Sequence, residues 1–223
     1  MIKYEYGDPG SSNVLVQMVD DHDLAVIESE VKEIRELAGS DFYLIALKVN
    51  DWNKDLSPWP APPVFGDEPF GEGAAETLAN VLEETRDRDK KYYIGGYSLA
   101  GLFALWAVYR TDVFSGAAAA SPSVWFPGWI EYAEKHWQSA QEGTGQSDSL
   151  KSGPQRIYLS LGDKEERTRN QQMARVGDCI RRQHEILTAA GVANTLVWEQ
   201  GNHFKEPDLR TSRAFAWVMG GMR

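Results

Sequence analysis

The stretch that decides the fold reads YYIGGYSLAGLFALW and covers residues 92–106. Its first part holds two tyrosines and an isoleucine, which is typical of a short strand. Its last part is rich in leucine, phenylalanine and tryptophan, which is typical of a buried helix. Between these parts Ser98 stands in a run of small residues. The stretch therefore predicts a strand, a sharp turn that carries Ser98, and a helix.

This layout matches the nucleophile elbow, G-x-S-x-G, in which a strained strand-to-helix turn presents a serine. The residues two positions from the serine must be small, because strand and helix nearly collide there. Gly96 meets this need, and Ala100 replaces the second glycine with one added methyl group. Because the helix directs its first amides at the serine oxygen, we expect the backbone amide of Leu99 to be one oxyanion donor. The alternative is a buried serine at a strand end that performs no chemistry.

Length and composition limit the class of protein. The 223 residues suffice for one α/β domain with a full core, and we expect a single domain over residues 1–223. Hydrophobic residues make up 42% and charged residues 25% of the chain, as in ordinary globular proteins. The formal net charge of −10 argues against nucleic acids and anionic membranes as partners.

Cysteine content and the N-terminal residues bear on the cellular compartment. The single cysteine, Cys179, excludes an internal disulfide framework. Residues 1–6 lack the apolar core of a signal peptide, and no apolar run reaches membrane-spanning length. We therefore expect a cytoplasmic protein. Whether the chain forms a homodimer is left open at this point.

Strand-like and helix-like segments alternate along the rest of the chain. Strands are predicted over residues 14–19, 42–49, 116–120, 157–161 and 195–199. Helices are predicted over residues 26–37, 74–86, 129–137 and 208–219, and one long charged helix is predicted with Met173, Val176, Ile180 and Leu187 as its buried stripe. Long loops are expected over residues 50–72 and 139–153. The alternation predicts an α/β fold with a mostly parallel sheet covered by helices on both faces.

An acid and a histidine follow two of the later predicted strands. Functional residues of open parallel sheets lie where the strands end. Asp163 comes two residues after the strand at 157–161, and His203 follows the strand at 195–199. Together with Ser98 they give the chain order Ser…Asp…His.

Each of these three residues has a chemical role in such an arrangement. A serine hydroxyl is a poor nucleophile until a base takes its proton, and an imidazole titrates near neutrality, so His203 can be that base. Asp163 would fix the histidine tautomer and stabilise the imidazolium. The alternatives are that Asp163 only caps a helix and that His203 is a surface turn residue. His22, His136 and His184 occupy less suitable positions.

Several sequence pieces resemble the putative esterase, or esterase D-like, branch of the α/β-hydrolases. The pieces are GYSLAG at 96–101, SPSVW at 121–125, LGD at 161–163 and GNHF at 201–204. The resemblance covers about residues 14 to 219 and implies an α/β-hydrolase fold. Because the chain is short, we expect no large cap domain. The branch includes S-formylglutathione hydrolases, siderophore esterases and feruloyl esterases. DLSP at 55–58 resembles its Arg-x-x-Asp-Leu-Thr-Pro pattern, although the arginine is missing here.

The remaining parts of a site are expected from loops at the same end of the sheet. The second oxyanion donor should come from the loop after the first core strand, where the backbone amides of Asp21 and His22 are the candidates. Indoles outside a core often line sites. The predicted pocket walls are Trp52, Trp59, Trp125 and Trp129, whereas Trp106, Trp198 and Trp217 are expected in the core.

The motifs and the resemblance together predict a serine hydrolase of small-molecule carboxylic esters, with thioesters as a second substrate class. The reaction would pass through an acyl-enzyme and would need neither a metal nor another cofactor. One alternative is a siderophore-type esterase with a metal-chelating substrate, although the negative net charge disfavours anionic ferric complexes. The other alternative is a non-catalytic α/β-hydrolase-fold protein that serves as a binding module.

Overall fold

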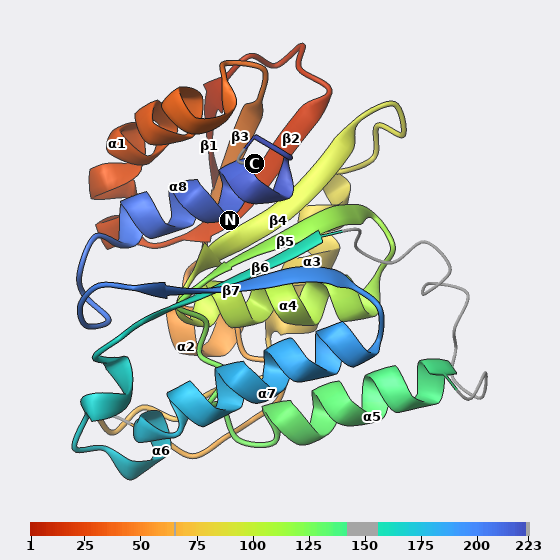
Figure 1. Ribbon diagram of the computed structural model, residues 1–223. Helices are drawn as coiled ribbons and strands as arrows, with labels where there is room; N and C mark the ends of the chain where they lie inside the picture. The colour runs from red at the N-terminus through yellow and green to blue at the C-terminus, as the bar shows by residue number, and fades with distance from the viewer. Residues whose placement is uncertain (65, 142–155, 222–223) are drawn as a thin grey trace.

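The computed structural model of the chain describes residues 1–64, 66–141 and 156–221. In these residues seven strands form one sheet with the order β1-β3-β2-β4-β5-β6-β7 (Figure 1). β1 pairs antiparallel with β3, and the other neighbouring strands pair parallel. The strands are β1 (Ile2–Gly7), β2 (Asn13–Val19), β3 (Tyr43–Lys48), β4 (Lys91–Tyr97), β5 (Phe114–Ala120), β6 (Arg156–Gly162) and β7 (Ala193–Glu199). The predicted mostly parallel sheet is confirmed.

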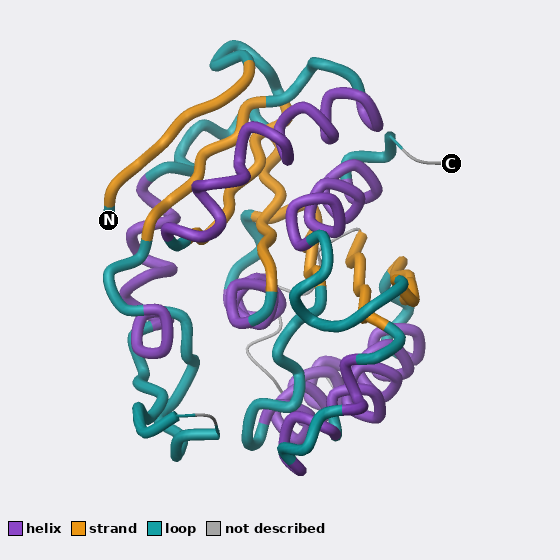
Figure 2. Tube along the Cα trace, turned by 90° about the vertical axis from the view of Figure 1, so that its left-hand side faces the viewer, coloured by secondary structure: helices purple, strands orange, loops and turns teal. Residues whose placement is uncertain are grey.

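Helices cover both faces of this sheet, as predicted. One face carries α1 and α8, and the other carries α3, α4, α5 and α7 (Figures 1 and 2). The helices are α1 (Asp21–Ala38), α2 (Trp52–Asp55), α3 (Ala74–Glu83), α4 (Leu99–Arg110), α5 (Trp129–Gln141), α6 (Gln171–Ala174), α7 (Val176–Ala189) and α8 (Pro207–Val218), with the 3-10 helix η2 (Glu165–Arg167). No helix in the described part of the chain is long and apolar enough to cross a membrane.

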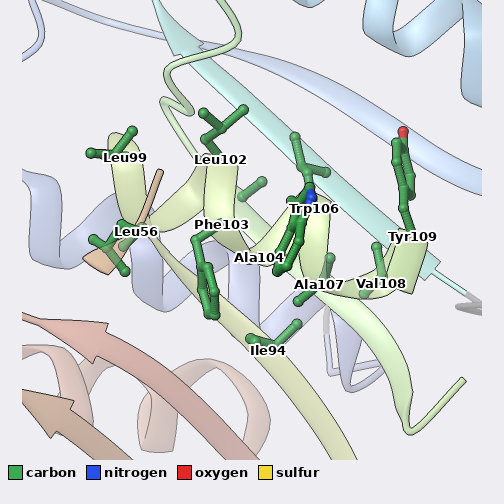
Figure 3. Packing of buried hydrophobic residues seen from close by; sticks show 14 of the residues in the cluster. Leu56, Ile94, Leu99, Leu102, Phe103, Ala104, Trp106, Ala107, Val108 and Tyr109 are labelled. Carbon is green, nitrogen blue, oxygen red and sulfur yellow. The ribbon is translucent and has the colours of Figure 1, made fainter. Parts of the chain in front are cut away.

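Helix α4 lies at the centre of the larger core. Every residue from Leu99 to Tyr109 is buried, which explains why this helix is apolar on all sides. Phe103 projects toward Ile94 of the neighbouring strand β4 (Figure 3). Because α4 is enclosed from Leu99 to Tyr109, the residue directly before it, Ser98, is held on a rigid support.

Some local predictions differ from the structure. The edge strand β1 is largely exposed and therefore carries no apolar pattern that would reveal it. The loop predicted over residues 50–72 contains the short helix α2. The predicted long charged helix is divided into η2, α6 and α7, because the side chain of Asn170 accepts hydrogen bonds from the Gln172 and Met173 amides and starts a new helix. Of the loop expected over residues 139–153, the part from 142 onward lies outside the described residues.

The three tryptophans expected in the core have different surroundings. Trp106 is buried, as predicted. Trp217 is partly buried against the core cluster below α1 and α8. The prediction for Trp198 is wrong, because 41% of this residue is exposed. It lies on the edge strand β7, where the Arg181 guanidinium covers its ring at 4.8 Å.

Candidate active site

The turn between β4 and α4 has the geometry of a nucleophile elbow. Ser98 adopts φ 56° and ψ −117°, a conformation that residues with a Cβ rarely adopt. A Cβ on Gly96 would lie 2.6 Å from the Cβ of Ala100, and one on Gly101 would lie 3.0 Å from the Gly96 carbonyl oxygen. The turn thus tolerates alanine at position 100, while it needs glycine at positions 96 and 101.

The loop after β5 supports the elbow. The Ser98 amide donates to the Ala120 carbonyl at 3.1 Å, and the Ser123 amide donates to the Ser98 carbonyl at 3.0 Å. The hydroxyl oxygens of Ser98 and Ser123 lie 3.2 Å apart. These contacts fix the strained serine to the next strand of the sheet.

His203 meets the serine from the loop between β7 and α8. Its Nε2 atom lies 3.0 Å from Ser98 Oγ, so a neutral imidazole can accept the hydroxyl proton. The Tyr97 hydroxyl donates to the His203 carbonyl at 2.7 Å, and the two rings lie against each other with centroids 5.1 Å apart. Tyr97 therefore holds both the backbone and the ring of His203.

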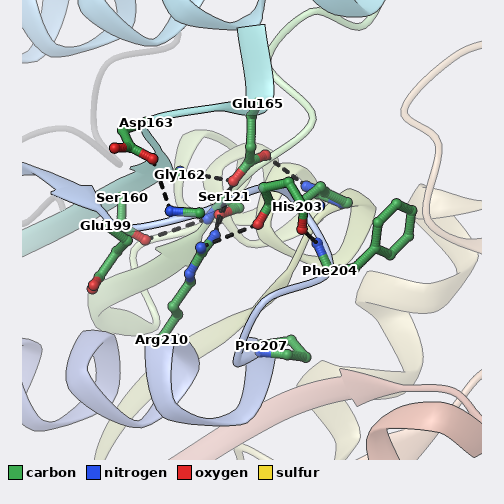
Figure 4. Close-up of polar contacts among 12 residues, drawn as sticks. Ser121, Ser160, Gly162, Asp163, Glu165, Glu199, His203, Phe204, Pro207 and Arg210 are labelled. Atoms are coloured by element: carbon green, nitrogen blue, oxygen red, sulfur yellow. Dashed lines mark hydrogen bonds and ion pairs between the residues drawn. The ribbon is translucent and has the colours of Figure 1, made fainter. Parts of the chain in front are cut away.

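The carboxylate that contacts His203 is Glu165 and not Asp163. His203 Nδ1 lies 2.6 Å from Glu165 Oε2, whereas Asp163 Oδ1 accepts a 2.8 Å hydrogen bond from the Gly201 amide (Figure 4). The prediction that Asp163 orients the histidine is therefore wrong. The path of the chain after β6 explains why Glu165 takes this position. The Asp163 amide donates to the Glu199 carbonyl, which keeps Asp163 beside β7, and the next turn of the chain brings Glu165 to the imidazole.

Glu165 is buried and fully engaged. Its Oε1 atom accepts hydrogen bonds from the Gly162 amide at 2.7 Å, the Ser121 hydroxyl at 2.8 Å and the Arg210 guanidinium at 2.9 Å, which leaves Oε2 for His203 (Figure 4). Burial raises the pKa of this carboxyl. The hydrogen bond and charge of His203 and the hydrogen bonds from Gly162 and Ser121 lower it by more, so the pKa lies below its ordinary value. Glu165 is thus ionised at neutral pH, as the stabiliser of an imidazolium must be.

The start of α1 borders the serine on the other side. Asp20 caps this helix: its Oδ1 atom accepts from the His22 amide at 2.7 Å and from the Asp23 amide at 3.0 Å, while the Asp23 carboxylate accepts from the Asp20 amide at 3.1 Å. The His22 amide is therefore not available as an oxyanion donor, contrary to prediction. Asp21 and Leu99 are the first residues of α1 and α4, positions whose amides have no partner within the helix.

A pocket of about 390 Å³ opens above Ser98. Three aromatic side chains border it, and one of them, Phe204, is 85% exposed at its rim. Two carboxylic acids also border it, and burial raises the pKa of Asp23 to about 6. In the described part of the chain no lysine or arginine lines this pocket. The lining residues are Asp20, His22, Asp23, Trp52, Tyr97, Ser98, His203, Phe204 and Pro207.

Of the four tryptophans predicted as pocket walls, Trp52 lines the pocket. The prediction is wrong for the other three, whose indoles fill space between the helices and loops on the α4 side of the sheet. Trp129 is fully buried, with its N–H donating to the Gln183 amide oxygen at 2.8 Å. Trp125 is buried against Phe70. Trp59 donates to the Pro127 carbonyl at 2.8 Å.

Two charged residues at the site, Glu165 and Arg210, were not predicted from the sequence. Glu165 follows Asp163 by two residues, so a second carboxylate after β6 was the signal that could have found it. Arg210 lies in the first turns of α8, and no local pattern separates it from the other arginines. Among the residues that the structure describes, no group of three or more His, Cys, Asp or Glu side chains could hold a metal ion.

Comparison with known families identifies the protein class. A family model described as putative esterase matches residues 66–203, more than half of the chain. The chain belongs to the putative esterase family. It is accordingly a carboxylic ester hydrolase, and its substrate is a small-molecule ester. Among curated protein sequences, none matches this esterase.

Solved structures with a similar fold include several hydrolases. The siderophore hydrolase EstA from Aspergillus nidulans is 19% identical, with a TM-score of 0.67 over 96% of this chain and 85% of that chain. The IroE-like serine hydrolase from Shewanella oneidensis is 13% identical, with a TM-score of 0.65 over 98% and 73%. The fluorophosphonate-binding serine hydrolase FphF from Staphylococcus aureus is 12% identical, with a TM-score of 0.62 over 97% of both chains. At these identities the likeness shows the α/β-hydrolase fold.

Proposed function

We propose that this esterase works through an acyl-enzyme on Ser98, with His203 as the general base and acid and Glu165 as the partner of His203. One observation carries the proposal: Ser98 Oγ, the two ring nitrogens of His203 and Glu165 Oε2 form a continuous chain of contacts at 3.0 and 2.6 Å. A nucleophile, a base and an orienting carboxylate in this geometry are what acyl transfer requires.

In the first half of the reaction, Ser98 Oγ attacks the ester carbonyl carbon while its proton passes to His203 Nε2. The negative charge of Glu165 stabilises the imidazolium that forms. The tetrahedral oxyanion faces the start of α4, where the Leu99 amide is the first donor and the Asp21 amide is our candidate for the second. When the intermediate collapses, the ester C–O bond breaks and His203 gives its proton to the leaving alcohol.

In the second half, water replaces the alcohol. His203 takes a proton from the water as its oxygen attacks the acyl carbon on Ser98. Collapse of this second intermediate breaks the bond to Ser98 Oγ and returns the proton to the serine. The products are the carboxylic acid and the free enzyme, so no further reactant is needed.

The pocket suggests which esters fit. Trp52 and Phe204 offer apolar surface beside the nucleophile, which favours aryl or medium-length acyl groups over acetate. The carboxyl groups of Asp20 and Asp23, with no lysine or arginine in the described lining, disfavour anionic substrates. Neutral carboxylic esters are therefore the proposed substrate class, with thioesters as the second.

A series of p-nitrophenyl esters that differ in acyl length tests this function, with aryl esters assayed alongside. Wild-type protein and the Ser29→Ala variant, whose serine is exposed on α1, are expected to hydrolyse the longer esters faster than the acetate. The Ser98→Ala variant is expected to be inactive. Absence of turnover by the wild type would instead favour the non-catalytic binding module. A single domain over residues 1–223 and a cytoplasmic location remain proposals from the sequence, and light scattering would decide between monomer and homodimer.

A further inference from the structure

Arg210 of helix α8 is charged and almost completely enclosed, with 1% of its surface exposed. A guanidinium is always charged in proteins and is almost never fully buried without partners. One of its terminal nitrogens donates to the Tyr97 hydroxyl at 3.1 Å, the Ser121 hydroxyl at 3.1 Å and Glu165 Oε1 at 2.9 Å. The other donates to the carbonyls of Gln200 at 3.3 Å and Asn202 at 3.1 Å.

These five acceptors lie at the ends of four consecutive strands. Tyr97 ends β4, Ser121 follows β5, Glu165 follows β6, and the last two acceptors follow β7. The sheet order β4-β5-β6-β7 makes these strands direct neighbours. One guanidinium therefore joins the segments that carry Ser98, Glu165 and His203. Figure 4 shows Arg210 beside Ser121 and Glu165.

The contacts of Arg210 act on both partners of the imidazole–carboxylate pair. On one side Arg210 shares Oε1 of Glu165 with the Ser121 hydroxyl, so that Oε2 points to His203. On the other side it holds the carbonyl of Asn202, the residue before His203, and the hydroxyl of Tyr97, which itself donates to the His203 carbonyl. Arg210 is not among the residues that line the pocket, so any effect on catalysis passes through these groups.

We infer that Arg210 is a positioning residue of this active site, which holds Glu165 and His203 in register and offsets the negative charge that Glu165 presents to the imidazole. The inference rests on the proposed function of these residues. Arginine suits this task because its planar fork of five N–H groups can serve acceptors on two sides at once. A lysine ammonium carries the same charge on one nitrogen and could not donate in the same planar fork to acceptors on two sides.

The charge effect follows from the groups that face His203. Glu165 faces it from η2, Tyr97 from β4 and Ser98 from the start of α4. Across the pocket lie His22 and the carboxyl groups of Asp20 and Asp23, all from the start of α1.

Each carboxylate favours the imidazolium, and the guanidinium opposes it by pairing with Glu165. Arg210 therefore offsets part of the negative charge that faces the imidazole. Without the guanidinium, the carboxylate would favour the protonated ring, which cannot accept the Ser98 proton.

Two substitutions separate charge from geometry. Arg210→Gln removes both, and we expect kcat to fall about 10- to 100-fold, KM to change less than about twofold, and the acid limb of kcat/KM to move up by about half a pH unit or more. Arg210→Lys keeps the charge but loses the planar fork of N–H groups. We therefore expect kcat to fall while the acid limb of kcat/KM stays in place. Arg213→Gln is the matched control, because Arg213 lies one turn further along α8 and pairs with Glu199 at 2.9 Å.

The pH titration of the His203 ring by NMR supplies a readout that does not depend on turnover. The ring is expected to titrate at a higher pH in Arg210→Gln than in the wild type or in Arg210→Lys. Equal titration in all three folded proteins, or wild-type kcat in either Arg210 variant, would overturn the inference. Should Arg210→Gln not fold, Arg210→Lys decides through its kcat and acid limb. Failure of the proposed function is distinguishable, because wild-type protein would then show no turnover while the ring titration still tests Arg210.

Discussion

Glu165 contacts the imidazole of His203 at 2.6 Å, while Asp163, two residues earlier, binds the Gly201 amide. The two carboxylates that follow β6 thus have separate tasks. Asp163 joins the β6 turn to the loop that carries His203, and Glu165 places a carboxylate beside the imidazole. The same short segment thus contacts the ring of His203 and the backbone of the loop that carries it.

Exchange of each carboxylate for its amide tests this division. Glu165→Gln is expected to lower kcat by about 10³- to 10⁴-fold, because the imidazolium loses its stabilising charge and the amide can favour the wrong tautomer. Asp163→Asn keeps an oxygen for the Gly201 amide and should cost less than about tenfold. Steady-state kinetics on one p-nitrophenyl ester, with thermal melts as the folding control, measures both. A larger loss in Asp163→Asn than in Glu165→Gln would restore the assignment made from sequence.

The pH dependence of kcat/KM gives a second test. The proposed mechanism requires a neutral imidazole, so kcat/KM should rise as the pH increases and the protonated fraction of the base falls. Because the pKa of Glu165 is lowered by its hydrogen bonds and by His203, this carboxyl stays ionised from pH 5 to 8 and adds no limb of its own. His203→Ala should remove the limb and most of the rate. A flat wild-type profile from pH 5 to 8 would point to another base.

The parts of the site that local sequence determines were predictable. Small residues around Ser98 follow from the elbow, since the close contact of Gly96 with Ala100 forbids larger ones. That His203 lies beside Ser98 could be expected, because both residues follow the carboxyl ends of strands in a largely parallel sheet. The choice between Asp163 and Glu165 was not predictable in this way, because it depends on how the turn after β6 pairs with β7.

The pocket walls show a different limit. Residue type identifies an indole but not its surroundings, so Trp129 in the core and Trp52 in the pocket look alike in sequence. What separates them is the packing of α5 and the preceding loop, which depends on residues far apart in the chain. Arg210 was missed for a related reason, because its acceptors come from the ends of four strands.

Substitution of Asp23 links the pocket to stability. Burial raises the pKa of this carboxyl from its ordinary value of 3.8 to about 6 in the folded protein, so above pH 6 the fold must hold a charge that burial disfavours. As the pH falls from 6 to 4, the folded state takes up a proton that the unfolded state does not, and this cost disappears. Asp23→Asn should therefore raise the free energy of unfolding at pH 8 by about 1 kcal/mol, after allowance for solvent screening.

Urea unfolding at pH 8 and pH 4 measures this effect. The difference between Asp23→Asn and wild type should be present at pH 8 and nearly absent at pH 4. Glu28→Gln, an exposed change on the same helix, serves as the control and should have little effect at either pH. A destabilised Asp23→Asn protein at pH 8 would show that the charged form of this carboxyl stabilises the start of α1.

Trp52 is expected to contribute to substrate preference. Its indole borders the pocket, so Trp52→Ala should lower kcat/KM for medium-length acyl esters by about 1 to 3 kcal/mol and should affect acetate less. Trp198→Ala is the control, since Trp198 lies half-exposed on β7 and does not line the pocket. Equal losses on all esters in a folded Trp52→Ala protein would mean that this tryptophan is structural.

Mass spectrometry after treatment with a fluorophosphonate shows whether Ser98 is the nucleophile that His203 activates. We expect one adduct per wild-type chain, mapped to the peptide that carries Ser98, no adduct in Ser98→Ala and a much slower one in His203→Ala. An adduct on a different residue, or equal labelling of Ser98→Ala and wild type, would contradict this assignment.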